Sequence, residues 1–157
     1  MVEGMLQFYI YDFSEMDPID SGAFNFNAQG LFDPFPGLDA YWMDEGAYPL
    51  LVEFDGRAAG LVLINTLSHL TGGRVERNMG EFFIARQYRR AGVATAALHK
   101  TLALYPGRWE VAVVARNSVA KAFWPKAIAA APNVSEVDVA QGDGVHWTGP
   151  IWRFLAT

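Results

Sequence analysis

The sequence predicts a single α/β domain over residues 1–157, with a mixed, mostly antiparallel sheet and helices on both faces. Short apolar segments separated by turn residues recur along the chain, as expected of strands. One segment between them, residues 93–105, repeats its apolar residues at helical spacing. The predicted order of strands, helix, strand, helix and strands favours one sheet covered by helices. A length of 157 residues suits one domain, and 52% hydrophobic residues can form its core.

The first third of the chain is expected to begin with a strand and to continue as an irregular segment. Residues 6–11 are apolar and aromatic, which favours a strand. Residues 12–37 are rich in Asp, Asn, Gly and Pro, with interleaved phenylalanines. We expect turns there that are held down by aromatic side chains, and at most one short helix, over residues 38–43.

The middle of the chain predicts a hairpin followed by a further strand. Residues 48–54 and 58–67 are apolar and flank an Asp55-Gly56 turn, which is a strong hairpin signal. The glycines near residue 72 turn the chain again. Residues 75–85 then form the strand that leads into the helical segment.

The remaining elements follow from similar signals. Pro106 and Gly107 end the helix of residues 93–105. A strand is expected next, at residues 109–115, followed by a helix that begins at Asn117. A last hairpin is expected from residues 134–140 and 145–155.

The turn before the helix of residues 93–105 is suited to binding a phosphate. Free backbone amides at a helix start, reinforced by the helix dipole, bind anions. Arg89 and Arg90 add positive charge beside them. Gly92 and Ala94 are small enough for a diphosphate to approach the backbone, and Thr95 offers a hydroxyl donor. The alternative interpretation is a surface turn with solvated arginines.

Several function classes are disfavoured by the sequence. It contains neither a Walker-type loop nor a G-x-G-x-x-G motif. A net charge of −5 argues against nucleic acid as a partner. The absence of cysteine excludes a thiol nucleophile, and the three histidines lack metal-ligand spacing, so we expect no metal. Without a long apolar run or an export signal, we expect a cytoplasmic protein, monomer or homodimer, with no membrane partner.

Three ordered blocks of sequence together resemble one known family. Residues 89–94, Arg-Arg-Ala-Gly-Val-Ala, fit the family's Arg/Gln-x-x-Gly-x-Gly/Ala diphosphate loop. They stand between the strand-like segments at residues 81–84 and 109–115, and residues 117–124 fit its Asn-x-x-Ala-x-x-Phe-Tyr/Trp helix entry. The chain thus resembles the GNAT superfamily of acyl-CoA-dependent N-acetyltransferases. The pattern EFF…YRR.G…WEV…N..A..FW is similar to that of a bacterial branch of this superfamily.

The resemblance implies that the strands at residues 75–85 and 109–115, the fourth and fifth of the family, splay apart and admit the pantetheine arm of acetyl-CoA. Backbone groups of the first strand would bind that arm, and the Ile84 amide would face the thioester oxygen. The residues expected to bind the cofactor are Phe83, Ile84, Ala85, Arg89, Arg90, Ala91, Gly92, Val93, Ala94, Thr95, Asn117, Ala120, Phe123 and Trp124. Asn117 has two expected roles, as a helix cap or as a pantetheine ligand.

Glu81 is the candidate general base. It adjoins the most apolar part of its strand, where partial burial would raise the pKa of its carboxyl group toward neutrality. The rival interpretation is an edge carboxylate paired with Arg77, Arg86 or a lysine. The family's usual glutamate position falls on Asn78. Residues 78 and 81 would point to opposite faces of a regular strand, so only a β-bulge would bring Glu81 to the same face as Asn78.

The residue that would protonate the leaving sulfur is open. The family often places a tyrosine where this chain has Trp124, and an indole does not titrate usefully. Tyr88, Tyr11 and His146 are candidate substitutes. Because a thiol has a pKa of only about 8.5, the thiolate can also leave without a proton donor.

These features predict an N-acetyltransferase in which an amine attacks acetyl-CoA directly in a ternary complex. The acceptor is a small-molecule or peptide amine, and the acidic residues crowded into the first third favour a cationic one. The aromatic residues Tyr41, Trp42, Tyr48 and Trp147 either line the acceptor pocket or belong to the core. The alternatives are a domain of the same fold that senses acyl-CoA without turnover, and a structural domain that binds no CoA.

Overall fold

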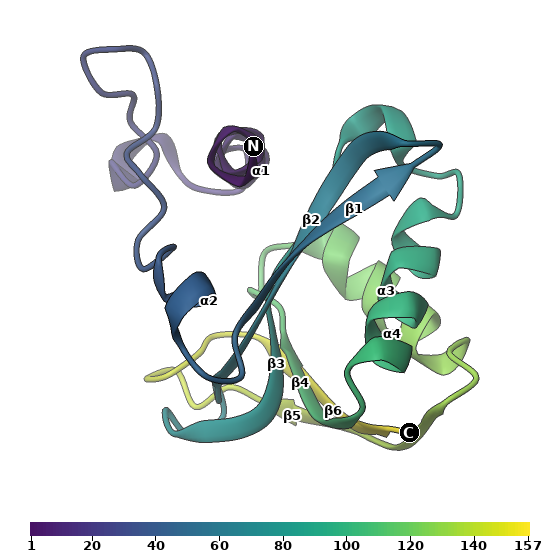
Figure 1. The fold of residues 1–157 in the computed structure, drawn as a ribbon. Coiled ribbons are helices and arrows are strands. Elements are labelled where there is room, and N and C mark those ends of the chain that lie inside the picture. Colours follow the sequence, from purple (N-terminus) through teal and green to yellow (C-terminus); the bar gives the residue numbers. More distant parts are fainter.

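A computed structural model describes residues 1–157 as one α/β domain built on a six-stranded sheet (Figure 1). The strand order is β1-β2-β3-β4-β6-β5, and all neighbours are antiparallel except β3 and β4. The strands are β1 (Tyr48–Phe54), β2 (Arg57–Leu67), β3 (Arg74–Ile84), β4 (Gly107–Ala112), β5 (Val134–Gln141) and β6 (Pro150–Ala156). The α-helices are α1 (Val2–Ser14), α2 (Ala40–Met43), α3 (Val93–Leu104) and α4 (Ser118–Ala129), with 3-10 turns at Ile19–Ser21 and Arg86–Tyr88. The predicted mixed sheet with helices is confirmed.

Helices cover both faces of the sheet at its centre. On one face α3 and α4 cover the larger core, to which Val62 and Ile64 of β2 contribute. On the other face α1 and α2 cover a smaller core, to which Leu61 and Leu63 of β2 contribute (Figure 1). Alternate residues of β2 therefore enter different cores, which explains why residues 58–64 of this strand are an unbroken apolar run.

The predicted strand at residues 6–11 is wrong, because these residues lie within helix α1. The helix buries Leu6 completely, and Val2, Met5 and Tyr9 pack beside it against the smaller core. These positions follow the i, i+3, i+4, i+7 spacing of a helix face. The periodicity appears only over the whole 13-residue helix, whereas residues 6–11 alone are too apolar to show a period.

Residues 15–39 have little regular structure, as the sequence predicts, and aromatic and polar contacts hold them down. Gln7 of α1 is hydrogen bonded to both backbone groups of Phe32, at 2.9 Å to the amide and 3.2 Å to the carbonyl. The Phe26 and Phe32 rings lie 4.8 Å apart. The short helix α2 falls within the predicted residues 38–43 and places Tyr41 against the sheet.

The remaining predicted elements match the structure within a few residues. The Asp55-Gly56 turn has both residues at positive φ and joins β1 to β2. The last hairpin is formed by β5 and β6, although residues 145–149, predicted as strand, precede the start of β6. None of the helices is both long and apolar enough to cross a membrane.

Two irregularities of β3 shape the centre of the molecule. First, Leu63 is paired with Glu81 but Ile64 with Met79, so Gly80 is an extra residue that forms a β-bulge. Second, β3 pairs with β4 only at Arg77 with Trp109 and Asn78 with Glu110. Beyond these pairs the two strands diverge, as the family resemblance implies.

The bulge needs a glycine because other groups fill the space beside it. A Cβ atom at Gly80 would lie 2.4 Å from the Tyr41 hydroxyl, 2.7 Å from Asn65 Nδ2 and 3.1 Å from the Leu63 carbonyl. We therefore predict that Gly80→Ala lowers the free energy of unfolding by about 2 kcal/mol, measured by denaturant titration.

Gly4→Ala is the matched control. Gly4 lies on the exposed face of α1 with no atom within 4 Å of a built Cβ, so alanine should raise stability by about 0.5–1 kcal/mol through helix propensity. A Gly80→Ala protein as stable as the parent would contradict the proposed role of the bulge.

Candidate active site

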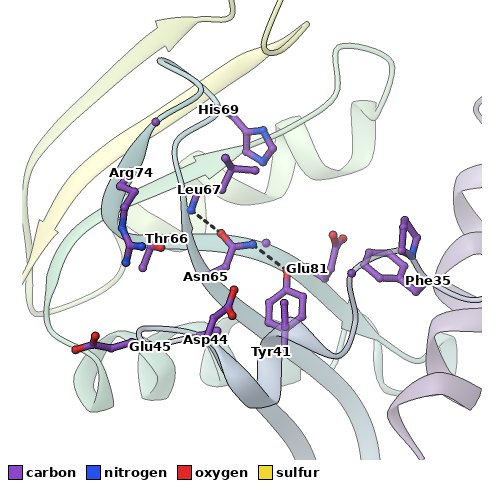
Figure 2. A pocket seen from close by; sticks show the side chains of 16 residues that line it. Phe35, Tyr41, Asp44, Glu45, Asn65, Thr66, Leu67, His69, Arg74 and Glu81 are labelled. Atoms are coloured by element: carbon purple, nitrogen blue, oxygen red, sulfur yellow. Dashed lines mark hydrogen bonds between the residues drawn. The ribbon is translucent and has the colours of Figure 1, made fainter.

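Two cavities meet at the centre of the sheet. The larger, which we call the cleft, has a volume of about 1040 Å³ and lies between the diverging ends of β3 and β4. The smaller, which we call the pocket, has a volume of about 470 Å³ and lies between α2 and the ends of β2 and β3 (Figure 2). His69, Gly80 and Glu81 line both cavities. A group bound in the cleft and a group bound in the pocket would therefore meet near Glu81.

The turn before α3 presents free backbone amides to the cleft. None of the amides of residues 90–95 donates a hydrogen bond within the protein. Gly92 caps the helix with φ of 79°, a left-handed conformation that glycine adopts without strain. Gly92, Ala94 and Thr95 line the cleft. This helix start is thus an anion site with its donors unused.

The arginines of this turn differ in their contacts. Arg86 and Arg89 both form ion pairs with Asp12 of α1, and Arg89 Nε also donates to the Ile84 carbonyl at 2.7 Å. Although burial acts to raise it, hydrogen bonds from the two arginines hold the pKa of Asp12 below its usual value. Arg90 forms no ion pair and lines the cleft. Arg90 is therefore the arginine free to meet an anion.

The edge of β3 that faces the cleft exposes the backbone groups of every second residue. The Ala85 amide donates to the Ala59 carbonyl at 2.8 Å, so this backbone group points toward β2. Along an antiparallel pair, residues whose amide and carbonyl groups bond to the partner strand alternate with residues whose backbone groups point away from it. Because Ala85 bonds to β2, the backbone groups of Ile84 and Phe82 point away from β2, toward the cleft. Ile84 and Phe83 both line the cleft. Phe82 is a cleft residue that was not predicted from the sequence.

The start of α4 closes the far side of the cleft. Asn117 caps this helix, because its Oδ1 accepts a hydrogen bond from the Ala120 amide at 2.9 Å. Asn117, Ala120, Phe123 and Trp124 all line the cleft. Trp124 is only 5% exposed, and its ring stands edge-on to the Phe82 ring at 5.2 Å, so it belongs mainly to the core.

Three of the residues expected at the cofactor site do not line the cleft with their side chains, namely Ala85, Ala91 and Val93. Val93 is buried against Ala59 and Ile84 instead. The amides of Ala91 and Val93 remain free at the helix start.

Glu81 projects between the two cavities from the residue after the bulge. Met79 enters the core under α3 and α4, and without the extra residue Glu81 would follow it to that face. Because of the bulge, Glu81 instead shares the opposite face with Asn78. The β-bulge thus resolves the parity conflict between these two positions.

The Glu81 carboxylate accepts a hydrogen bond from the Tyr9 hydroxyl of α1. It is not paired with Arg77, Arg86 or a lysine, which was the rival interpretation. Burial raises the pKa of Glu81 to about 7, and the hydrogen bond from Tyr9 acts in the opposite direction. A carboxylate with this pKa can accept a proton near neutral pH.

A hydrogen-bonded row of polar side chains lines the pocket side of the sheet. Asn78 donates to Asn65 Oδ1 at 2.8 Å. Asn65 Nδ2 in turn donates to the Tyr41 hydroxyl oxygen at 2.9 Å (Figure 2). Burial raises the pKa of Tyr41 to about 12, so this hydroxyl stays protonated. The row fixes the wall of the pocket beside Glu81.

The four aromatic residues considered for an acceptor pocket lie in different parts of the structure. Tyr41 lines the pocket, whereas Tyr48 packs against the core and Trp42 is exposed. Trp147 lines the cleft, where its ring lies 4.4 Å from that of His69. Burial lowers the pKa of His69, which favours its neutral form.

The candidate proton donors lie outside both cavities. Tyr88 packs against Phe54 at 5.8 Å, Tyr11 is exposed near Arg86, and His146 is hydrogen bonded to Asp143 on the surface. The tyrosine that does reach the cleft is Tyr9, which was predicted to lie in a strand. The helical spacing of α1 was the signal that could have placed it on the buried face.

Comparisons with known proteins agree with this architecture. The sequence model of the Acetyltransferase (GNAT) family matches residues 10–128. No protein of curated function matches the chain in sequence. An acetyltransferase from Thermus thermophilus is 16% identical, with a TM-score of 0.57 over 76% of this chain and 70% of that chain. A GNAT-family acetyltransferase from Staphylococcus aureus is 10% identical, with a TM-score of 0.57 over 96% of this chain and 90% of that chain.

The two structures share the fold of this chain at low sequence identity. The family match extends over most of the sequence and includes the bulged strand β3, the free amides before α3 and the start of α4. The chain therefore belongs to the GNAT family of acetyltransferases.

Proposed function

We propose that this GNAT-type N-acetyltransferase transfers the acetyl group of acetyl-CoA to the amine of a small cationic molecule or peptide, in a ternary complex. The observation that carries the proposal is the position of Glu81, which lines both the cleft and the pocket. The cleft would hold acetyl-CoA and the pocket the acceptor. We extend the proposal to all of residues 1–157 as one acetyltransferase domain, acting in the cytoplasm as a monomer or homodimer.

The cleft suits acetyl-CoA along its whole length. The unbonded amides of residues 90–95 and the side chain of Arg90 would bind the diphosphate. The Ile84 amide would donate to the thioester oxygen as negative charge develops on it. The Phe82 backbone and the Phe123 ring would contact the pantetheine arm.

Glu81 supplies the proton acceptor that the reaction needs. When the amine nitrogen bonds to the thioester carbon, its extra proton would pass to the Glu81 carboxylate. The carbon–sulfur bond then breaks, and the sulfur leaves as a thiolate, which a pKa of about 8.5 for the free thiol permits. The raised pKa of Glu81, about 7, matches the base to neutral pH.

The pocket suits a cationic amine. Asp44 and Glu45 line it together with Glu81, and neither Asp44 nor Glu45 forms an ion pair with a basic side chain of this chain. Arg74 is the one arginine or lysine in the lining. The carboxylates therefore outnumber it and would attract an ammonium group to the pocket.

Release of free thiol from acetyl-CoA across a panel of amines tests the function. Turnover with one class of amine supports the proposal. A rise in thermal midpoint with acetyl-CoA but no thiol release with any amine would favour a sensor. No rise at a large excess of CoA would exclude the cofactor.

We predict that Gly92→Glu abolishes CoA binding, measured by calorimetric titration. The new carboxylate would stand among the free amides and repel the diphosphate. Gly92→Ala is the control: no atom lies within 4 Å of a Cβ built there, so only the left-handed backbone resists alanine. Alanine should weaken binding by no more than about tenfold. Retained affinity in Gly92→Glu would remove the phosphate assignment.

We predict that Glu81→Gln lowers kcat at least about 100-fold and leaves the affinity for CoA unchanged. In the parent, kcat should fall as the pH drops through about 7, because the raised pKa leaves Glu81 protonated below that value. The Glu81→Gln variant should not show this fall of kcat at low pH. A variant with the kcat and pH profile of the parent would assign Glu81 a structural role.

We predict that Asp44→Asn and Glu45→Gln each raise KM for a cationic acceptor about fivefold, with a smaller effect on kcat. The reason is the loss of one attractive charge from the pocket lining. Glu53→Gln is the control, since Glu53 is exposed on β1 and lines neither cavity. An equal KM in all these proteins would show that the acceptor does not bind in the pocket.

A further inference from the structure

The Glu81 carboxylate has one side-chain hydrogen-bond partner in the protein, the Tyr9 hydroxyl. Tyr9 belongs to α1 and lines the cleft next to Glu81. Its hydroxyl donates to Oε2, and no donor of the protein occupies Oε1. One carboxylate oxygen is thus held, while the other stays available to the amine of the acceptor substrate.

The Tyr9 ring is fixed by aromatic contacts on two sides. The Phe13 ring lies 4.8 Å away, and the Phe83 ring stands nearly perpendicular to it at 6.2 Å. Burial and the neighbouring Glu81 raise the pKa of Tyr9 well above its usual value, so its hydroxyl remains a donor at every working pH. The direction of the hydrogen bond is therefore defined.

Helix α1 itself is anchored on both sides of Tyr9. Leu6 is buried in the smaller core, and on the other side of Tyr9, one turn further along the helix, Asp12 is paired with Arg86 and Arg89. The Tyr9 hydroxyl is consequently held in place by the helix rather than by a mobile loop.

We propose that Tyr9 is a positioning residue for the general base: its hydroxyl holds the Glu81 carboxylate at the junction of the two cavities. The role rests on the proposed function of Glu81 in acetyl transfer. Tyr9 would also keep the carboxylate ionised, because a donor to Oε2 stabilises the charged form against burial.

The other groups that face Glu81 do not duplicate this contact. Tyr41 of α2 accepts a hydrogen bond from Asn65 Nδ2 and forms no hydrogen bond with Glu81. His69, which follows β2, lines both cavities, and its ring lies 4.4 Å from that of Trp147. Asp44 after α2 carries like charge and cannot donate. Arg86, on the α1 side, is bound to Asp12.

The test is Tyr9→Phe, which removes the hydroxyl and keeps the ring between its aromatic neighbours. The matched control is Tyr105→Phe, because Tyr105 is also packed on a ring, that of Tyr48 at 4.6 Å, and lies outside both cavities. Calorimetry compares the thermal midpoints of the three proteins. The ¹³C carboxyl signal of Glu81, assigned by its loss in Glu81→Gln, then gives the titration midpoint directly.

We expect the Glu81 midpoint in Tyr9→Phe to rise by about one pH unit, since the carboxylate loses its only donor. The acid limb of kcat should move upward with it, which lowers kcat about fivefold at pH 7, while KM for acetyl-CoA stays within about twofold. Tyr105→Phe should leave the Glu81 midpoint, the pH profile of kcat and KM for acetyl-CoA unchanged.

An unchanged Glu81 midpoint in folded Tyr9→Phe overturns the proposal. So does a pH profile of kcat that superimposes on that of the parent, which would leave Tyr9 a packing role. The titration needs no turnover. If no amine is acetylated but the midpoint moves, the hydrogen-bond role stands and the assignment of the reaction fails.

Discussion

The extra residue Gly80 in β3 is the constraint on which the site depends. In a regular strand the side chain two residues after Met79 would enter the core under α3 and α4. The bulge at Gly80 turns Glu81 to the other face, where α1 and α2 form the walls of the site. The same glycine leaves room for the Tyr41 hydroxyl and the Asn65 amide, which no side chain at this position would allow. The direction of the Glu81 side chain and the shape of the pocket are therefore both determined by Gly80.

The divergence of β3 from β4 supplies the second half of the site. Their parallel pairing ends at Asn78 with Glu110, so the backbone of β3 beyond that point has no partner strand on one side. Unpaired backbone groups at a sheet edge normally favour aggregation or a covering element. Here they face a cleft that also receives the free amides at the start of α3. A ligand with a peptide-like arm and an anionic end would satisfy both sets of groups, as the proposed binding of acetyl-CoA requires.

The sequence was most informative where a local pattern decides the structure. The hairpin around Asp55-Gly56 and the amides near Gly92 depend on turn residues and helix starts, and both were predicted. The strand assigned to residues 6–11 failed because an aromatic-rich segment resembles a strand unless a longer window reveals the helical period. Tyr9 was missed with it, since its contact with Glu81 joins residues 72 positions apart. A glycine inside a strand is a known bulge signal, but its effect on Glu81 appears only once the register with β2 is available.

Helix α1 connects the two halves of the site through side chains one turn apart. Tyr9 contacts the carboxylate between the cavities, and Asp12 forms ion pairs with Arg86 and Arg89 of the turn before α3. Because both side chains belong to one rigid helix, a shift of α1 that loosened one contact would disturb the other. The family match begins at residue 10, so Tyr9 lies just outside it. The Tyr9–Glu81 hydrogen bond therefore joins a residue just outside the matched range to one inside it.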